Sequence, residues 1–281
     1  MLNKNYLKYD FYNGIVFEWK KYGIFFCYIF FLCARFIAMH HRLTEWMDLE
    51  KNLSFGDFMT YILKGMRFYE PMQTDIYIPD FAWILIYVYI AFVVNSYPIK
   101  DLYGYGQMVL IRSQKRSFWW KSKCIWNVFN VGIFYMIIIL NSFIFALISG
   151  ADRIMPQQSI QMYYNQMDVS QLTNGQFIFE VVVVPLMVTV ALYLLQMVVS
   201  IVIHPVIGFV LSVSIYILSV YSSESWLMGN YLMLMRNRVF NSTSSINSYK
   251  GIICSIFLIL VSLLTGYLRF RKLDIWTDNN E

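Results

Sequence analysis

Six long apolar runs dominate the pattern of this chain, and the segments between them carry almost all of its charged residues. An α-helix rises about 1.5 Å per residue, so about 20 apolar residues cross the hydrocarbon core of a bilayer. We therefore predict six membrane-spanning helices, over residues 22–39, 81–98, 126–149, 181–203, 206–221 and 251–268.

The fourth and fifth runs form one uncharged stretch that is interrupted by the pair His204-Pro205. Proline lacks a backbone N–H and clashes with the preceding turn of a helix. We therefore expect the chain to break at this pair and to form two spans joined by a tight turn.

The first 21 residues precede the first apolar run and carry an apolar residue at every fourth position: Leu7, Phe11, Ile15 and Trp19. Lys4 and Lys8 fall outside this stripe. Such a pattern is typical of an amphipathic helix that lies along the membrane surface, so we predict an N-terminal interfacial helix over residues 1–21. A frayed basic tail is the alternative interpretation.

The composition also indicates a membrane protein. Hydrophobic residues make up 58% of the chain and charged residues 14%, whereas ordinary globular chains contain about a quarter charged residues. The mean hydropathy is +0.51. These values exclude soluble, disordered, collagen-like and disulfide-rich classes, and they predict a single all-α integral membrane domain over residues 1–281.

The charges of the loops predict the orientation of the chain. If the N-terminus lies inside, the inner segments carry 13 Lys and Arg and the longer outer segments carry 8. The inner segments are then 1–21, 99–125 and 269–281, and the outer segments are 40–80, 150–180 and 222–250. Basic residues concentrate on the cytoplasmic side, so we expect both termini in the cytoplasm. The net charge of +5 has the same origin, and we expect no nucleic-acid partner.

Signatures of enzymes are nearly absent from the sequence. The chain contains no P-loop motif and no H-E-x-x-H or G-x-S-x-G motif, so we predict no catalytic residue in it. His40 and His41 are adjacent, and neighbouring residues of a helix point about 100° apart. We therefore expect no metal site and no cofactor in this chain. The four cysteines form no C-x-x-C pair and are interpreted as buried apolar residues.

Two charged residues near the predicted spans are candidates for a translocation pathway. Arg35 lies inside the first span, where a charge is costly, and Glu180 directly precedes the fourth span. Each has a structural alternative. Arg35 can extend its side chain to the outer surface, and Glu180 can stabilise the N-terminus of a helix.

The inner segment 103–123 combines a short apolar stretch, a basic turn and a cluster of aromatic residues before the third span. These features predict a short helix at the membrane surface with a charged elbow that points to the cytosol. The alternative is an ordinary positively charged loop with interfacial aromatic anchors, and physical reasoning alone favours it.

Two motifs carry a resemblance to a known family. The first comprises Gly104-Tyr-Gly106, Ile111-Arg112-Ser113, Arg116, Trp119-Trp120 and Lys123. It resembles the first inner loop of ABC-2-type permeases in bacterial exporters of peptide antibiotics and bacteriocins. The second, Trp226-Leu-Met-Gly229-Asn230-Tyr231 with Met233 and Arg236, is similar to the segment before the last helix of those permeases. With the six-helix pattern, the resemblance covers nearly the whole chain.

The resemblance implies a permease subunit in the bacterial plasma membrane, surrounded by membrane lipids. It implies two protein partners, a separate P-loop ATPase that binds ATP and Mg²⁺ and a second permease subunit, identical or related. The substrate would be an exported amphipathic peptide or lipid-like compound. The loop after the second span would hold the cytoplasmic coupling helix, with Tyr103, Gly104, Gly106, Arg112, Lys115, Arg116, Trp119, Trp120 and Lys123. The segment with Trp226, Gly229, Asn230 and Arg236 would re-enter the outer leaflet.

An intramembrane enzyme and an immunity factor without transport are the alternative functions. An intramembrane enzyme needs paired carboxylates or histidines within the bilayer, whereas Arg35 is the one formally charged residue inside a predicted span. A neighbouring gene that encodes a P-loop ATPase would favour the exporter.

Overall fold

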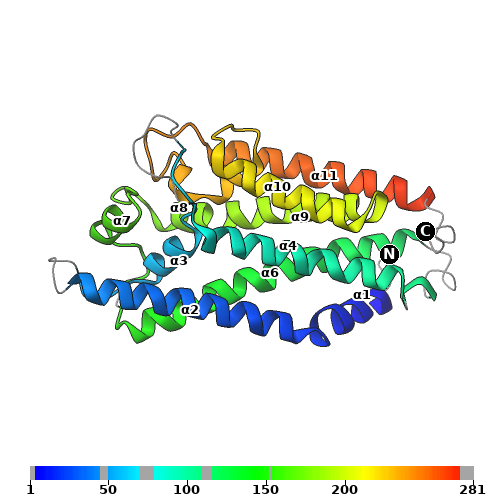
Figure 1. The fold of residues 1–281 in the computed structure, drawn as a ribbon, viewed down its shortest axis with the longest axis horizontal. Helices are drawn as coiled ribbons and strands as arrows, with labels where there is room; N and C mark the ends of the chain where they lie inside the picture. The colour runs from blue at the N-terminus through cyan, green and yellow to red at the C-terminus, as the bar shows by residue number, and fades with distance from the viewer. Residues whose placement is uncertain are drawn as a thin grey trace.

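The computed structural model describes residues 4–44, 50–69, 79–104, 106–108, 116–151 and 153–272. Its long helices are α2 (Trp19–Thr44), α4 (Phe81–Leu102), α6 (Arg116–Ile148), α9 (Val184–Val202), α10 (Pro205–Tyr221) and α11 (Ser248–Lys272). They lie side by side in one elongated bundle (Figure 1). Its shorter helices are α1 (Lys4–Phe11), α3 (Phe55–Leu63), α7 (Gln158–Tyr164) and α8 (Asn174–Ile178). The predicted all-α fold is confirmed for the residues described.

Five helical segments of the described residues are long and apolar enough to cross a membrane. They are α2, α4, α6, the continuous run from α8 through α9, and α11. The fifth predicted span, α10, is apolar but has only 17 residues, which at 1.5 Å per residue is about 25 Å. A multi-pass membrane protein is thus supported, and the count of six spans remains a prediction.

The start of the third span differs most from the sequence prediction. Helix α6 begins at Arg116, ten residues before the predicted boundary at residue 126. The basic and aromatic residues before that boundary resemble a loop in sequence, but they form the first turns of the helix. The prediction that this stretch belongs to the loop is therefore wrong.

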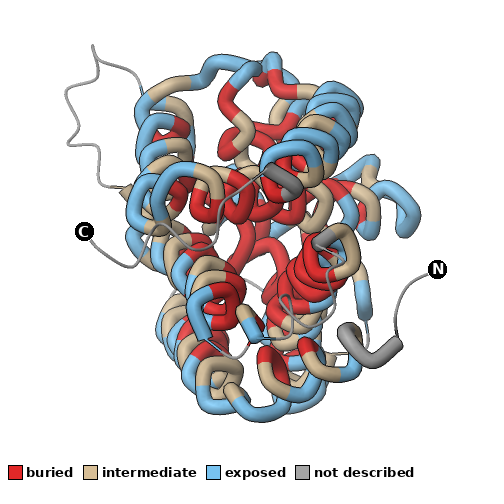
Figure 2. The backbone as a smooth tube through the Cα atoms, turned by 90° about the vertical axis from the view of Figure 1, so that its right-hand side faces the viewer, coloured by how far each residue is buried: buried red, intermediate tan, exposed pale blue. Residues whose placement is uncertain are grey.

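Helix α9 lies at the centre of the bundle, where it contacts α4, α6, α10 and α11. Buried residues run through the middle of the molecule, and exposed ones form its outer surface (Figure 2). Polar side chains in this interior bond between helices. Tyr193 Oη donates to Tyr87 O at 2.7 Å, and Gln196 Nε2 donates to Ala91 O at 2.8 Å. These bonds fix α9 against α4 within the apolar core.

The two ends of the bundle are built differently, and we name them after their short helices. At the α1 end lie α1, the C-terminal end of α4, the start of α6 and the end of α11; at the α3 end lie α3, α7 and α8 (Figure 1). The described parts of the three predicted outer segments meet at the α3 end, as backbone hydrogen bonds Gly56 N to Ile154 O and Met235 N to Lys64 O indicate. The side of the membrane that each end faces remains a prediction.

The predicted break at His204-Pro205 is confirmed. His204 has extended backbone angles, and its side chain accepts a hydrogen bond from the Val206 backbone N–H. Pro205 is the first residue of α10, a position where its missing N–H costs nothing because that group has no partner within the helix. The turn between α9 and α10 is therefore as tight as predicted.

The N-terminal helix is present, but its predicted single apolar stripe is wrong. Phe11 and Trp19 are exposed, whereas Ile15 is buried. A π-helical turn, η1 (Tyr12–Val16), lies between α1 and α2. The predicted helix is thus interrupted, and Phe11, Ile15 and Trp19 belong to three successive helical segments. The position of this helix along a membrane surface remains a prediction.

Candidate functional site

Three charged side chains are buried together at the α1 end, and we call Asp10, Asp101 and Lys123 the ionic knot. Lys123 Nζ lies 2.7 Å from Asp101 Oδ2 and also forms an ion pair with Asp10. The three residues belong to α1, α4 and α6, and the Lys123 side chain is 0% exposed. Since a buried unpaired charge is strongly destabilising, these contacts hold the three helices together.

Neutral donors complete the ionic knot. Tyr97 Oη donates to Asp10 Oδ1 at 2.8 Å, and Trp119 Nε1 donates to Asp101 Oδ2 at 2.9 Å. Tyr9 Oη donates to Asp101 Oδ1 at 3.1 Å. Two carboxylates face one ammonium group, so these donors stabilise the negative charge that Lys123 does not balance. The Tyr97 ring also lies 4.3 Å from Lys123 Nζ, where its face attracts the cation.

The ionic knot joins the two helices that flank the predicted coupling loop. Asp101 lies in the last turn of α4, before the loop, and Lys123 lies in α6, after it. Tyr103 and Gly104 are exposed at the end of α4. An added Cβ at Gly106 would collide with the Asp101 side chain, so glycine permits the chain to pass over the knot. Arg112 and Lys115 lie outside the described residues, as does the side chain of Arg116, the first residue of α6.

Three of the predicted coupling residues are buried within the bundle. Trp119, Trp120 and Lys123 are 1%, 3% and 0% exposed. The Trp119 ring stacks on Phe270 at a centroid distance of 4.7 Å, and Trp120 Nε1 donates to Leu263 O at 3.3 Å. These residues connect the base of the loop to α11. They can position the loop, but they do not present a surface to a partner.

At the α3 end, the segment before α11 folds into two 3₁₀ helices, η3 (Met228–Leu232) and η4 (Leu234–Arg236). Asn230 and Arg236 of this segment are each 0% exposed, and its re-entry into the outer leaflet remains a prediction. Trp226 differs, since it is 71% exposed. An added Cβ at Gly229 would collide with Ser219 of α10, so glycine allows the two backbones to approach closely.

Arg236 caps the C-terminal end of α10. Its guanidinium donates to Val220 O at 2.8 Å and also to Ser219 O, two carbonyls in the last turn of that helix. Such carbonyls lack partners within the helix and form the negative end of its dipole. The same side chain donates to Asn230 Oδ1 at 2.6 Å and to Met66 O at 3.0 Å. Arg236 therefore joins α10, the 3₁₀ segment and the chain after α3, a role that sequence reasoning did not find.

The two candidate pathway residues have separate partners. Arg35 is exposed on α2, and its Nε donates to Tyr61 Oη at 3.2 Å. Glu180 is 3% exposed in the π-helical turn η2 (Phe179–Val183). It accepts hydrogen bonds from Asn237 Nδ2 at 2.5 Å and from Ser248 Oγ. Glu180 thus fastens the 3₁₀ segment and α11 to α9.

No group of three or more His, Cys, Asp or Glu residues lies close enough to hold a metal ion in the part of the chain that the structure describes. All four cysteines are free, and Cys27 and Cys254 are exposed on their helices whereas Cys33 and Cys124 are buried. The prediction that all four are buried is therefore wrong for two of them.

Comparison with known proteins gives one family match. Residues 25–276 match the family model described as "Protein of unknown function (DUF2705)". No curated protein and no solved structure matches the chain. Because the match covers most of the chain, the protein belongs to the DUF2705 family.

Proposed function

We propose that this chain, a member of the DUF2705 family, is the permease subunit of a bacterial ABC exporter. A separate P-loop ATPase binds ATP and Mg²⁺, and the permease works as a pair of identical or related subunits. The substrate is an amphipathic peptide or a lipid-like compound, and both termini face the cytoplasm. The two motifs that resemble ABC-2-type permeases and the bundle of apolar helices support this proposal.

The single observation that carries the proposal is the ionic knot beneath the α4–α6 loop. A coupling loop must transmit the movement of the ATPase to the helices, and a flexible loop would absorb that movement. Here Asp101 and Lys123 lie close to the two ends of the loop and are bound to each other at 2.7 Å. Asp10 extends the connection to α1, and the stacking of Trp119 on Phe270 extends it to α11. A push on the loop would therefore move four helices together.

The proposed cycle uses the loop as a lever. ATP binding brings two ATPase subunits together, and their movement is transmitted through the coupling loops of the two permeases. The buried side chains of each bundle bond across helices, as Tyr193 does with Tyr87, so each subunit moves as a rigid unit. The transport pathway then lies between the two permeases and opens alternately to the two sides of the membrane.

Charge reversal in the basic elbow of the loop tests this proposal. The chain is co-expressed with the P-loop ATPase encoded beside its gene, and wild type is compared with the double variant Arg112→Glu, Arg116→Glu. Like charges placed across an interface cost up to several kcal/mol, with about tenfold weaker binding for each 1.4 kcal/mol. We expect the variant to insert normally, to lose the ATPase during purification and to lose substrate-stimulated ATP hydrolysis.

A matched control is Arg238→Glu, because Arg238 is exposed at the α3 end and should not affect the ATPase. Equal recovery of the ATPase with wild type and with the double variant would contradict the proposed docking of the loop. If no ATPase is encoded beside the gene or binds the chain, the exporter proposal is overturned in favour of a function without transport.

A further inference from the structure

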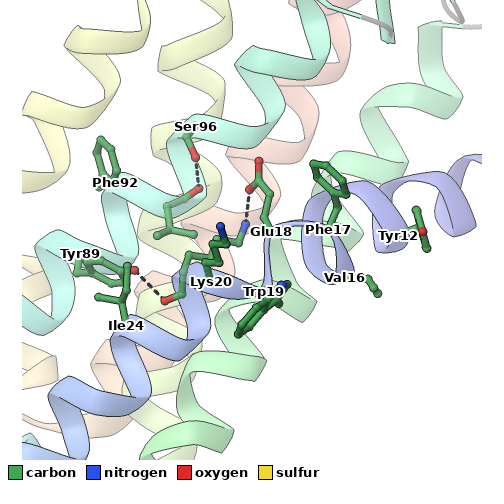
Figure 3. Close-up of a pocket in the computed structure, with 12 residues that line it drawn as sticks. Tyr12, Val16, Phe17, Glu18, Trp19, Lys20, Ile24, Tyr89, Phe92 and Ser96 are labelled. Carbon is green, nitrogen blue, oxygen red and sulfur yellow. Dashed lines mark hydrogen bonds and ion pairs between the residues drawn. The ribbon is translucent and has the colours of Figure 1, made fainter.

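A groove of about 780 Å³ lies on the side of the bundle between the start of α2 and the C-terminal half of α4. Figure 3 shows the side chains that line it. Ile24 and Phe92 form an apolar part on the two helices, and Glu18 and Lys20 lie closer to the α1 end. The groove therefore changes from apolar to charged along the direction of the bundle axis.

The base of the groove is held by specific contacts. Tyr89 Oη, from α4, donates to the backbone carbonyl of Lys21 in α2 at 2.7 Å, and the Tyr89 ring stacks with Phe25 at 5.9 Å. Lys21 Nζ donates to Gly14 O at 2.9 Å. These bonds join α2, α4 and the π-helical turn η1, so the groove is a built feature rather than a gap between loosely packed helices.

The charged part of the groove has an excess of positive charge. Glu18 forms ion pairs with Lys21 at 2.8 Å and with Lys100 at 3.6 Å. Lys20 is exposed and also lines the groove, and the Lys100 side chain is 75% exposed. Two lysines thus pair with one carboxylate and Lys20 adds a third positive charge to the groove, and Lys20 and Lys100 are accessible to a ligand from outside.

We propose that this groove binds an anionic phospholipid, with its headgroup at Lys20 and Lys100 and an acyl chain against Ile24 and Phe92. The distribution of charge and apolar surface is complementary to such a lipid. Trp19 lines the same groove and is 65% exposed, as is typical of a residue at the headgroup level of a membrane. In the proposed orientation the lipid belongs to the inner leaflet. The inference needs no ATPase, so it can hold or fail independently of the exporter function.

Lipid binding is measured by native mass spectrometry of the full chain, purified in detergent and equilibrated with equal amounts of dioleoylphosphatidylglycerol and dioleoylphosphatidylcholine. The two lipids have the same acyl chains, so a preference reports the headgroup. We expect wild type to retain the phosphatidylglycerol. A basic residue near an anionic headgroup contributes about 1 kcal/mol, so Lys20→Gln and Lys100→Gln should each weaken its retention roughly fivefold. Lys250→Gln removes an exposed lysine at the start of α11 and should change nothing.

A steric variant tests the apolar part of the groove. Ile24 is 61% exposed, so Ile24→Trp should fill the groove without disturbing the core and should reduce retention of both lipids. Leu264→Trp is the control, because Leu264 is 62% exposed on α11 away from the groove. Equal retention of the two lipids by wild type would overturn the proposal. So would unchanged retention in the Lys20→Gln, Lys100→Gln double variant or in Ile24→Trp, since the lipid would then bind elsewhere.

Discussion

The two ends of the bundle both bury charged side chains, but they stabilise them in different ways. At the α1 end, Lys123 pairs with the opposite charges of Asp10 and Asp101. At the α3 end, the described contacts of Arg236 include carbonyl oxygens, the amide oxygen of Asn230 and the ring of Phe68. In these contacts the α1 end pairs side-chain charges with each other, and the α3 end stabilises a buried charge with uncharged polar groups.

This difference in the partners of the buried charges follows from the kind of backbone that meets at each end. A helix uses its own carbonyls in internal hydrogen bonds, except in its last turn. The α1 end brings together continuous helices, so side-chain charges must make the connections between them. The α3 end contains irregular chain and the end of α10, which offer unused carbonyls to a guanidinium. Opposite charges therefore join helices at one end, and Arg236 joins non-helical chain to the end of α10 at the other.

Asp57 follows the same rule at the α3 end. Its carboxylate accepts hydrogen bonds from Gln157 N at 3.0 Å and Gln161 Nε2 at 2.7 Å, and Ser54 donates to it within a capping box of α3. Burial raises the pKa of Asp57, although these hydrogen bonds act in the opposite direction. Neutral donors therefore offset only part of the desolvation of this carboxylate.

The largest effect is expected from Lys123→Met at the α1 end. The substitution leaves Asp10 and Asp101 buried side by side without a cation, and breaking a buried ion pair costs about 3–5 kcal/mol. The free energy of unfolding in detergent, measured by thermal or denaturant unfolding, should fall by this amount. Lys121→Met, at an exposed position of α6 two residues before Lys123, is the matched control and should have little effect.

The triple variant Asp10→Asn, Asp101→Asn, Lys123→Met sharpens this result. It removes all three charges and keeps polar groups for Tyr97, Ser122 and Trp119 to contact. Replacing a whole buried ion cluster is often nearly neutral, so most of the stability should return. A triple variant that is as unstable as Lys123→Met alone would show that packing, and not charge balance, explains the loss.

A smaller but local effect is expected from Arg236→Lys at the α3 end. Lysine has no planar fork of donors, so it cannot bond to the carbonyls of Met66, Arg67 and Val220 at once. Each carbonyl left buried without a donor costs about 1–3 kcal/mol. Hydrogen exchange should increase in residues 226–246 and at the end of α10. Unchanged exchange there, or an equal increase around the ionic knot, would contradict the separate construction of the two ends.

The bundle was predictable from sequence to the extent that its signals are local. The apolar runs and the His204-Pro205 break depend on consecutive residues, and the structure contains both features. The early start of α6 was missed because Lys121, Lys123 and the adjacent tryptophans look like a loop. Lys123 is buried only because Asp10 and Asp101 approach it from distant parts of the chain, and sequence order contains no sign of that approach.

In the candidate site, too, local features could be predicted from the sequence and contacts between distant residues could not. The motif around Gly229, Asn230 and Arg236 identified a segment that the structure places in contact with α9, α10 and α11. The carbonyls that bind Arg236 could not be predicted, since they depend on where α10 ends and how the chain after α3 returns. The sequence also contains a local signal for α3. Ser54 followed by Asp57 is the pattern of a capping box, which predicts the start of a helix at this position.

An intermediate effect is expected from Gly229→Ala. The added methyl group would overlap Ser219 of α10, and overpacking a tight contact costs about 1–3 kcal/mol. The loss should be measurable as a lower free energy of unfolding. In the double variant Gly229→Ala, Ser219→Gly the overlap is relieved, so the two changes together should cost less than their sum. A purely additive result would mean that Gly229 is needed for its backbone conformation and not for close approach.

The smallest effects are expected from two tyrosine hydroxyls, one at each end. Tyr9 Oη donates to Asp101 Oδ1 at 3.1 Å and Tyr231 Oη donates to Ser225 O at 2.7 Å. Removing either hydroxyl by Tyr→Phe should cost about 0.5–1.5 kcal/mol, the usual contribution of one hydrogen bond.

The costs of the two Tyr→Phe variants should differ when each is combined with Asp101→Ala. Tyr9→Phe should then cost less than it does in wild type, because its hydrogen bond to Asp101 is already gone, whereas Tyr231→Phe should keep its full cost, because distant sites add to within about 0.5 kcal/mol. The three single and two double variants are compared by unfolding in the same detergent. Coupling between Tyr231 and Asp101 as strong as that between Tyr9 and Asp101 would show that the two ends unfold as one network, and the distinction between them would fail.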